Sequence, residues 1–302
     1  MPRIDAHLHV FPKDPSSFPR QVSRARPALG EEPVEKLLEE MEASNIDQAV
    51  LVQASGSEIE HHAYINHCFK SYPNRFLGIG LIPNLPDPET HMSRLTEDGH
   101  IIGFRLSSVG GPTDPSEPVD IRKFKTFPIW KYAAENDHVL WLYPRASEAH
   151  LLPHLFDAFP QIRAVFNHLM VCPTPDTFTW DELGRPQIDT PMPPASHFVP
   201  VGEGESPACR YENVAVLVSA QYAFSKQPYP YLDLADWHQS LFSAFGPDRL
   251  MWATDFPWIV NNPGYAPLAG IVEELLPDLS PEDHAKLMGE TARNFLRFPE
   301  LP

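Results

Sequence analysis

Short apolar runs alternate with amphipathic stretches along almost the whole chain. The runs have the length of strands, and the stretches between them carry apolar side chains at helical spacing, as Val34, Leu37 and Met41 do. The sequence predicts strands at 3–11, 47–54, 75–83, 100–107, 139–144, 162–170, 213–220 and 249–255. It predicts helices at 33–44, 58–72, 88–97, 128–136, 147–159, 232–245, 268–276 and 280–298.

Strands that alternate with helices in this way indicate parallel strand–helix–strand units. Eight such units close into a (β/α)₈ TIM barrel, which typically needs about 250 residues plus insertions. The 302 residues therefore predict one α/β domain spanning positions 1–302. A doubly wound open sheet is the alternative, but it usually has a glycine-rich turn after its first strand, and the sequence has none there.

The segment 171–210 interrupts this rhythm. It is long, rich in proline and weakly periodic, and it follows the sixth predicted strand, at the end of the barrel where such enzymes keep their chemistry. It contains Trp180, Arg185, His197 and Arg210. We interpret this insertion as a lid or as a contact in a homo-oligomer, with a plain surface loop as the alternative.

Composition and charge exclude several classes of partner. Lys and Arg number 23 against 40 Asp and Glu, a net charge of −17, which would repel nucleic acids and anionic membranes. The partner expected is a small molecule, and an anionic one remains compatible because a site needs only local arginines. No apolar leader follows Met1, no apolar run reaches the roughly 18 residues of a membrane helix, and three cysteines suggest no disulfide framework. We expect a cytoplasmic protein.

Polar residues at the ends of three predicted strands carry the candidate chemistry. In the first strand, alternation predicts that Asp5, His7 and His9 share one face, toward the barrel interior, and that Ile4, Ala6 and Leu8 face the helices. His168 ends the sixth strand and Asp255 the eighth. The carboxyl ends of barrel strands meet at one mouth, so His7, His9, His168 and Asp255 are expected to converge. Such a set can bind a divalent ion or polarise a carbonyl group, whereas a surface His-x-His pair is the alternative.

The ordered set resembles the amidohydrolase superfamily, and more narrowly the amidohydrolase-related family of lactonases and metal-dependent decarboxylases. The resemblance rests on four segments, 4–11, 166–168, 248–257 and 290–296. It implies one divalent ion at most, Zn²⁺ or Mn²⁺, with His7, His9, His168 and Asp255 as ligands. Some lactonases of this family work without a metal, and a metal-free mechanism stays open.

Departures from the family pattern favour its lactonase branch. Family decarboxylases carry a histidine ligand at the end of the fifth strand, where this sequence has Tyr143 and Arg145. The fourth strand ends near Arg105, without the lysine of binuclear members. By this resemblance, Arg105, Tyr143 and Arg145 would contact an acidic substrate. At the sixth strand, the family's Asp-His-x-Gly is replaced by Asn-His-Leu-Met at 167–170.

These observations predict a hydrolase that adds water to a lactone or related ester-like carbonyl. Asp255 would be the general base, and His168 would polarise the carbonyl with the other imidazoles, directly or through a metal ion. The alternatives are a metal-dependent decarboxylase or other carbon–carbon lyase, and a barrel that binds without catalysis.

Three further features have structural interpretations. The run 107–111 forms either an anion-binding nest of backbone N–H groups or a plain turn. His61, His62, Tyr64 and His67 are interpreted as a solvated face of the helix 58–72. Cys172 follows the sixth strand but has no visible base beside it, which argues against a nucleophile.

Overall fold

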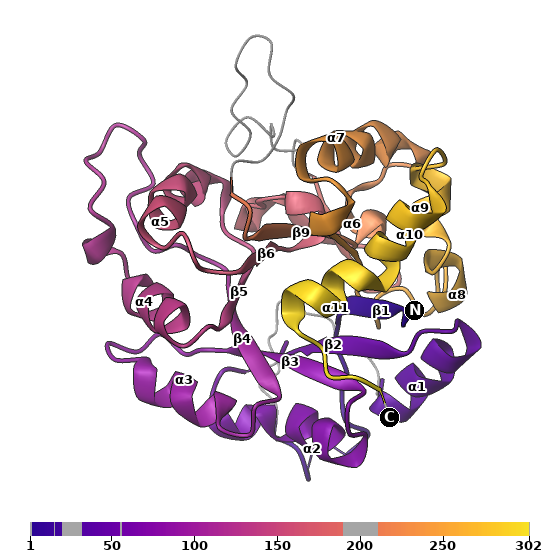
Figure 1. The fold of residues 1–302 in the computed structure, drawn as a ribbon, viewed down its shortest axis with the longest axis horizontal. Helices are drawn as coiled ribbons and strands as arrows, with labels where there is room; N and C mark the ends of the chain where they lie inside the picture. Colours follow the sequence, from indigo (N-terminus) through magenta and orange to yellow (C-terminus); the bar gives the residue numbers. More distant parts are fainter. Residues whose placement is uncertain (1, 15, 20–31, 55, 190–210, 302) are drawn as a thin grey trace.

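The computed structural model describes residues 2–14, 16–19, 32–54, 56–189 and 211–301. Within these ranges eight parallel strands form one sheet, in the order β1-β2-β3-β4-β5-β6-β9-β10 (Figure 1). Their bounds are β1 Ile4–Leu8, β2 Gln48–Val52, β3 Phe76–Leu81, β4 Ile101–Leu106, β5 Val139–Leu142, β6 Ala164–Phe166, β9 Val214–Val218 and β10 Leu250–Trp252. At the carboxyl ends of β1 and β10, Asp255 N donates to His7 O (3.0 Å) and His9 N donates to Phe256 O (2.7 Å). The predicted (β/α)₈ barrel is confirmed.

Helices cover the outside of the sheet between successive strands (Figure 1). They are α1 Val34–Ala43, α2 Ala63–Ser71, α3 Glu89–Thr96, α4 Phe127–Glu135, α5 Leu152–Ala158, α6 Gln221–Phe224, α7 Ala235–Phe245, α8 Tyr265–Leu268, α9 Ile271–Leu275, α10 Pro281–Ala285 and α11 Thr291–Leu296. The last predicted helix, 280–298, is interrupted by a π-helical turn, Lys286–Glu290, which separates α10 from α11. Ser280 caps α10 as expected, since its side chain accepts a hydrogen bond from Asp283 N.

The barrel interior is filled by alternate apolar side chains of the strands. Its buried members include Ile4 and Ala6 of β1, Val50 and Val52 of β2, and Trp141 of β5. A second buried cluster joins the outer face of the strands to the helices, with Leu8 of β1 among its members. Each strand is therefore apolar on both faces, as strands of a parallel barrel are.

The first strand does not follow the alternation predicted for it. Its register with β2 shifts between Asp5 and Leu8. Ile4 and Ala6 consequently fill the interior, while Asp5 binds Thr254 and Tyr265 instead of sharing a face with His7. A local irregularity of this kind exchanges the two faces of a strand, so the predicted facing of Ile4, Ala6 and Asp5 is wrong.

Asp5 ties β1 to β10 through a fully buried carboxylate. Its oxygens accept hydrogen bonds from Thr254 N (3.0 Å), Thr254 Oγ1 (2.5 Å), Tyr265 Oη (2.9 Å) and His7 N (3.3 Å). Burial raises the pKa of Asp5 to about 6, and the hydrogen bonds that its oxygens accept oppose the rise. Asp5 therefore has a structural role, since its hydrogen bonds connect β1 to the chain that follows β10.

We expect Asp5→Asn to lower the free energy of unfolding by about 1–3 kcal/mol, because the amide NH₂ would face a donor that now binds a carboxylate oxygen. Urea denaturation measures this, with Asp278→Asn at an exposed aspartate as the control. The control should change stability by less than about 0.5 kcal/mol. An Asp5→Asn protein as stable as the wild type would contradict the assignment.

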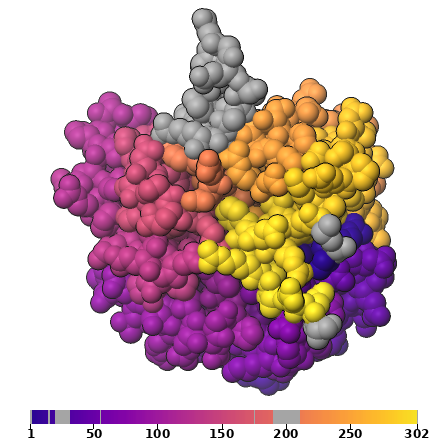
Figure 2. Space-filling view, viewed as in Figure 1, coloured from indigo at the N-terminus to yellow at the C-terminus, as the bar shows by residue number. Residues whose placement is uncertain are grey.

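The C-terminal segment closes the amino end of the barrel. Ala292, Leu296 and Phe298 belong to the interior cluster, and Gln48 Nε2 at the start of β2 donates to Pro299 O (3.0 Å). In the space-filling view this segment, in yellow, covers the centre of the molecule (Figure 2). The amino end is thus sealed, and the carboxyl ends of the strands form the opposite, open end.

The insertion after β6 contains a small hairpin. Strands β7 Phe178–Trp180 and β8 Pro186–Ile188 pair antiparallel, which the weak periodicity of this segment did not predict. Arg185 holds the hairpin turn through Asp181 (2.7 Å) and reaches Asn262 O (2.6 Å). Positions 190–210, with His197 and Arg210, lie outside the described residues.

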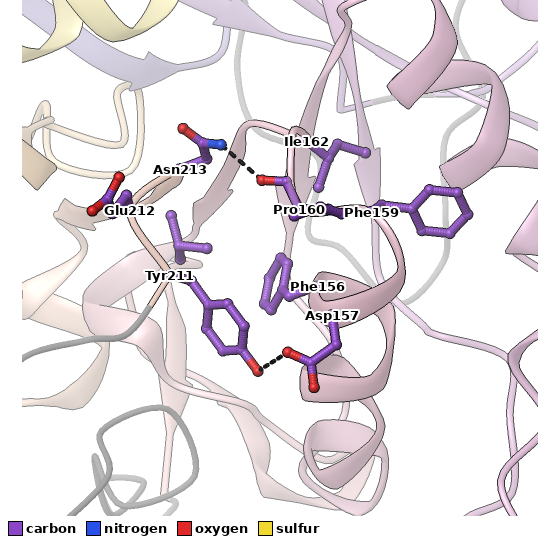
Figure 3. A pocket seen from close by; sticks show the side chains of 9 residues that line it. Phe156, Asp157, Phe159, Pro160, Ile162, Tyr211, Glu212 and Asn213 are labelled. Carbon is purple, nitrogen blue, oxygen red and sulfur yellow. Dashed lines mark hydrogen bonds between the residues drawn. The ribbon is translucent and has the colours of Figure 1, made fainter.

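A surface hollow of about 480 Å³ lies between α5 and the start of β9 (Figure 3). Two hydrogen bonds cross it, from Tyr211 Oη to Asp157 Oδ1 (3.1 Å) and from Asn213 Nδ2 to Pro160 O (2.8 Å). These bonds join α5 to the chain that enters β9, so the hollow is part of the packing of the barrel wall. No helix within the described ranges has both the length and the apolar character needed to cross a bilayer.

Candidate active site

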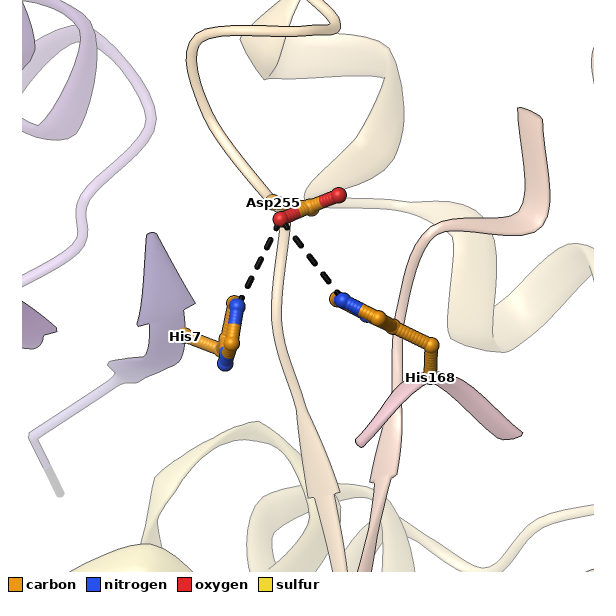
Figure 4. Close-up of side chains that lie close together, drawn as sticks. All are labelled: His7, His168 and Asp255. Carbon is orange, nitrogen blue, oxygen red and sulfur yellow. Dashed lines mark ion pairs between the residues drawn. The ribbon is translucent and has the colours of Figure 1, made fainter. Parts of the chain in front are cut away.

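Three imidazoles and one carboxylate meet at the open end of the barrel. His7 Nε2 and His9 Nε2 each lie 3.5 Å from Asp255 Oδ1, and His168 Nε2 lies 4.0 Å from the same oxygen. The side chains of His7 and His168 point at Asp255 from opposite sides (Figure 4). All four residues are at least 95% buried. The structure therefore brings together the four residues that strand-end positions single out in the sequence.

Left-handed backbone conformations aim two of these side chains. His168, Leu169 and Met170 follow β6 with φ values of 44°, 58° and 62°, and Asp255 follows β10 with φ 61°. Residues other than glycine rarely adopt this region of backbone conformation, and residues that do so are concentrated at functional sites. Trp237 Nε1 donates to Leu169 O (3.0 Å) and helps to hold the turn that presents His168. Met170 occupies the position where the family pattern has glycine.

Asp255 is oriented by a tyrosine that the sequence did not single out. Tyr222 Oη donates to Asp255 Oδ2 at 2.6 Å, which leaves Oδ1 directed at the imidazoles. Burial acts to raise the pKa of Asp255, but His168, His9 and the Tyr222 hydroxyl together outweigh it and hold the pKa below its ordinary value. Asp255 is consequently ionised at neutral pH despite its burial.

His7 and His168 are neutral at the same pH. Burial lowers the pKa of His7 well below its ordinary value, and the nearby His168, His9 and Arg105 lower it further. Burial also lowers the pKa of His168 to about 4, against the opposing effect of Asp255. Ser219 Oγ lies 2.9 Å from His168 Nδ1 and fixes that ring.

The ring nitrogens of His7 have assigned roles, because Trp141 Nε1 donates to His7 Nδ1 at 2.8 Å. An indole N–H can only donate, so Nδ1 accepts and the proton of the neutral His7 ring lies on Nε2. His9 is the reverse, since its Nδ1 lies 2.7 Å from Val52 O and a carbonyl can only accept.

The distances among His7, His168 and Asp255 suit a metal ion, but the position of the proton on the His7 ring does not. The ligating atoms of His7, His168 and Asp255 lie within 4.8 Å of one another. His7 Nε2 and Asp255 Oδ1 are buried without a hydrogen-bond partner among the described residues, as expected of groups that bind an added atom. A metal, however, needs a lone pair on its imidazole ligand, and Nε2 of His7 carries the proton. His7 as it stands does not fit a metal ion.

A cavity of about 610 Å³ opens above this cluster. His9, His168 and Asp255 lie in its lining, and so do Arg105 and Tyr143. Arg145, also predicted to contact substrate, is exposed and lines the cavity as well. The guanidinium of Arg105 stacks on the Tyr143 ring, 5.3 Å from its centroid. This size suits a small organic ligand, which such cavities largely enclose.

Apolar and aromatic groups form most of the rest of the cavity wall, several of them from the hairpin. The lining includes Phe178, Trp180, Ile188, Phe224 and Trp258. Trp180 and Trp258 contact each other, with ring centroids 6.2 Å apart. A flat, apolar ligand body with anionic groups near Arg105 and Arg145 would be complementary to these walls.

The anion-binding nest after β4 exists, and the chain itself fills it. Ser108 Oγ (2.8 Å), Val109 N (3.1 Å) and Gly110 N (2.9 Å) all donate to the carboxylate of the buried Glu148. The nest therefore has a structural role, because its hydrogen bonds to Glu148 join the loop after β4 to the segment after β5. These three donors are therefore occupied by Glu148 and do not face a substrate anion.

Two other sequence features take structural roles. His62 is fully buried, with Nε2 accepting from Leu81 N (3.0 Å), and burial lowers its pKa to about 4. The predicted solvated face is thus wrong for His62 and for the buried Tyr64 of α2, because both side chains accept hydrogen bonds from backbone N–H groups of other elements, His62 from Leu81 and Tyr64 from Val34. Cys172 is buried and burial raises its pKa to about 12, which leaves an unreactive thiol.

Tyr222, Ser219 and Trp141 are the site neighbours that the sequence reasoning missed. Ser219 and Tyr222 follow β9, so the strand-end rule used for His168 and Asp255 could have found them. Trp141 shares the interior face of β5 with Val139, and its position gave no hint that its N–H meets a histidine of another strand.

Comparisons with known proteins agree with this fold and identify a family. The family profile described as Amidohydrolase matches residues 4–298. A candidate 2-pyrone-4,6-dicarboxylic acid hydrolase from Pseudomonas putida is 20% identical, covers 100% of this chain and 99% of its own, and superposes with a TM-score of 0.69.

Two further solved structures have the same fold. An amidohydrolase from Burkholderia multivorans with bound zinc is 16% identical over 99% of this chain and 100% of its own, with a TM-score of 0.69. The 5-carboxyvanillate decarboxylase from Sphingomonas paucimobilis is 16% identical over 99% of both chains, with a TM-score of 0.63. No curated protein sequence matches the chain.

Proposed function

Because the chain belongs to the amidohydrolase family, we propose that it is a hydrolase that adds water to the carbonyl of a small, carboxylated lactone or related ester. The observation that carries this proposal is the convergence of three imidazole Nε2 atoms on one ionised carboxylate oxygen, Asp255 Oδ1. His9, His168 and Asp255 line a cavity that is also walled by arginines and aromatic rings, and His7 lies buried directly behind them. Such a convergence also argues against a barrel that binds without catalysis.

Asp255 is the proposed general base. Tyr222 holds Oδ2, so Oδ1 takes a proton from a water molecule as the water oxygen attacks the carbonyl carbon. The pair of electrons displaced onto the carbonyl oxygen forms an oxyanion, which His7 Nε2–H and His168 stabilise. The ring C–O bond then breaks, and protonated Asp255 returns the proton to the leaving oxygen, which yields a hydroxy acid.

Arg105 and Arg145 are proposed to bind the carboxylate of the substrate. Arg105 is half-buried and braced against Tyr143, a setting in which a guanidinium binds a carboxylate through two parallel hydrogen bonds. The aromatic rings of the hairpin and of Trp258 cover a planar ligand. We infer that this hairpin serves as a cover of the site, in keeping with the lid expected of the insertion.

A decarboxylase is the second candidate, because solved structures with this fold include decarboxylases of aromatic acids. The same carboxylate and imidazoles could protonate a ring carbon as carbon dioxide leaves. The absence of a histidine at the end of β5, where Tyr143 and Arg145 follow Leu142, favours the hydrolase.

The test is a panel of carboxylated lactones, including pyrone dicarboxylates, beside a panel of hydroxylated benzoic acids. We expect acid release from a member of the first panel, followed by indicator dye, and no carbon dioxide from the second. Carbon dioxide release from an aromatic acid, with every lactone left intact, would replace the proposal by the second candidate.

The pH profile of the hydrolysis is a separate prediction. A base acts only above its pKa, and the pKa of Asp255 is lowered, so kcat/KM should be independent of Asp255 ionisation between about pH 5 and about pH 8. His168, with a pKa of about 4, stays neutral over the same range. Initial rates across this range test the prediction, and an acid limb centred between about pH 6 and about pH 7 would contradict it.

A further inference from the structure

The two histidines of the His-x-His pair differ in what holds the nitrogen that faces away from Asp255. Behind His7 is a donor, the indole N–H of Trp141, at 2.8 Å. The planes of the two rings are nearly parallel, 18° apart, and their centroids lie 6.2 Å apart. Behind His9 is an acceptor, the carbonyl of Val52, at 2.7 Å.

These opposite partners impose opposite tautomers. His7 must accept at Nδ1, so its Nε2 carries the proton that points toward Asp255 Oδ1. His9 must donate from Nδ1, so in the neutral ring its Nε2 carries a lone pair. The pair thus differs in how the nitrogen nearest Asp255 is set. His7 presents a fixed N–H, whereas the Val52 carbonyl fixes only the Nδ1 proton of His9 and not that of its Nε2, which lies 3.5 Å from the same carboxylate oxygen.

We propose that Trp141 is a positioning residue that fixes His7 in the tautomer with its proton on Nε2, so that His7 serves as a hydrogen-bond donor to the substrate carbonyl oxygen and not as a metal ligand. This proposal rests on the proposed function for the role of the donor. The tautomer itself and its effect on metal binding do not depend on it.

The surroundings of Trp141 support this assignment of the His7 tautomer. Trp141 is fully buried in the barrel interior, in a cluster with Val139 and Val165, whose side chains carry no hydrogen-bond acceptor. Releasing the N–H from His7 would leave a buried donor unpaired, at a cost of about 1–3 kcal/mol. Histidine ligands of metals usually donate their second ring nitrogen to a carbonyl or carboxylate, as His9 does and His7 does not.

The proposal also divides the work between the two histidines. Under the proposal, the N–H of His7 would stabilise the negative charge that develops on the carbonyl oxygen. His9 Nε2, on the other side of Asp255 Oδ1, would lie beside the water that gives up its proton. A water molecule could donate to both His9 Nε2 and Asp255 Oδ1 while His7 Nε2–H remains available to the carbonyl. A metal bound to all the imidazoles would erase this difference.

The first experiment reads the tautomers directly in the full-length wild-type protein. Long-range ¹H–¹⁵N correlation spectra of protein labelled with ¹⁵N-histidine distinguish a protonated Nε2 from a protonated Nδ1. His7→Asn and His9→Asn variants assign the two rings. We expect the proton on Nε2 of His7 and on Nδ1 of His9, and a proton on Nδ1 of His7 would overturn the proposal.

The second experiment titrates Zn²⁺ alone into wild type, Trp141→Phe and a matched control, Trp252→Phe. Trp252 is equally buried, and its Nε1 donates to Leu268 O (2.8 Å), remote from the histidines. Loss of the Trp141 N–H frees His7 to shift its proton to Nδ1, so calorimetry should show Zn²⁺ binding at least about tenfold tighter in Trp141→Phe alone, the scale on which partners of ligating histidines act.

Each outcome decides the matter. Equal Zn²⁺ affinity in the wild type and Trp141→Phe would overturn the proposal. Tight wild-type Zn²⁺ binding that His7→Asn abolishes would overturn it as well. If Trp141→Phe does not fold, the wild-type spectra alone decide. A panel in which no lactone is hydrolysed would refute the proposed function and leave the spectra and the titration untouched, so the two failures are distinguishable.

Discussion

Replacement of Asp255 by asparagine is expected to lower turnover by about 10²–10⁴-fold, the scale of a lost general base. The amide oxygen can still accept the hydrogen bond from the Tyr222 hydroxyl. The amide NH₂ then faces the imidazoles in place of Oδ1, the oxygen proposed to take the proton from water. Asparagine also tolerates the left-handed backbone of this position, φ 61°, so the fold should survive. Substrate binding should change much less, and steady-state kinetics would show the loss in kcat and not in KM.

Thermal unfolding and near-ultraviolet circular dichroism would establish that the Asp255→Asn protein is folded. Tyr222→Phe is a graded companion, because it leaves the carboxylate in place and removes only the donor that orients it, so its kcat should fall by less. Near-normal turnover in folded Asp255→Asn would show that another group takes the proton. His9, whose Nε2 lies 3.5 Å from the same oxygen, would then be the first to examine.

Replacement of Arg105 by methionine should weaken kcat/KM for the carboxylated substrate by about 10²-fold, because hydrogen bonds to a charged group contribute roughly 1.5–3 kcal/mol each. Methionine keeps an unbranched apolar side chain against Tyr143 and removes the guanidinium fork. Kinetics with the substrate and with its methyl ester separate the two effects. Arg105→Met should lower kcat/KM for the free acid and leave kcat/KM for the methyl ester nearly unchanged.

Arg122→Met is the matched control, at a side chain that is 82% exposed and away from the cavity. It should leave both substrates unchanged. Arg105→Lys should recover only part of the loss, since a lysine cannot form the paired hydrogen bonds of an arginine. If Arg105→Met weakened the acid and the ester equally, Arg105 would shape the cavity instead of binding the carboxylate.

Periodicity was sufficient to predict the barrel, because each strand and helix of this fold leaves its own local signature. The candidate site followed from topology. Once the strands were placed in order, their carboxyl ends had to meet, and His7, His9, His168 and Asp255 had to lie near one another. The structure places their facing atoms within 4.0 Å of Asp255 Oδ1.

Contacts between distant strands are what the sequence could not supply. The register shift in β1, which puts Ile4 and Ala6 inside and Asp5 outside, depends on pairing with β2 and on donors from Thr254 and Tyr265. The bond between Trp141 and His7 joins residues 134 positions apart. Such pairings leave no periodic trace, yet here they decide which nitrogen of His7 carries the proton.

The addition of solvent water to the substrate carbonyl is the central claim, and hydrolysis in water enriched with oxygen-18 tests it most directly. Mass spectrometry of the product of the accepted lactone should show one oxygen-18 atom in the new carboxylate, none in the released hydroxyl group, and no carbon dioxide. A product that lacks solvent oxygen and has lost a carboxylate as carbon dioxide would contradict the account.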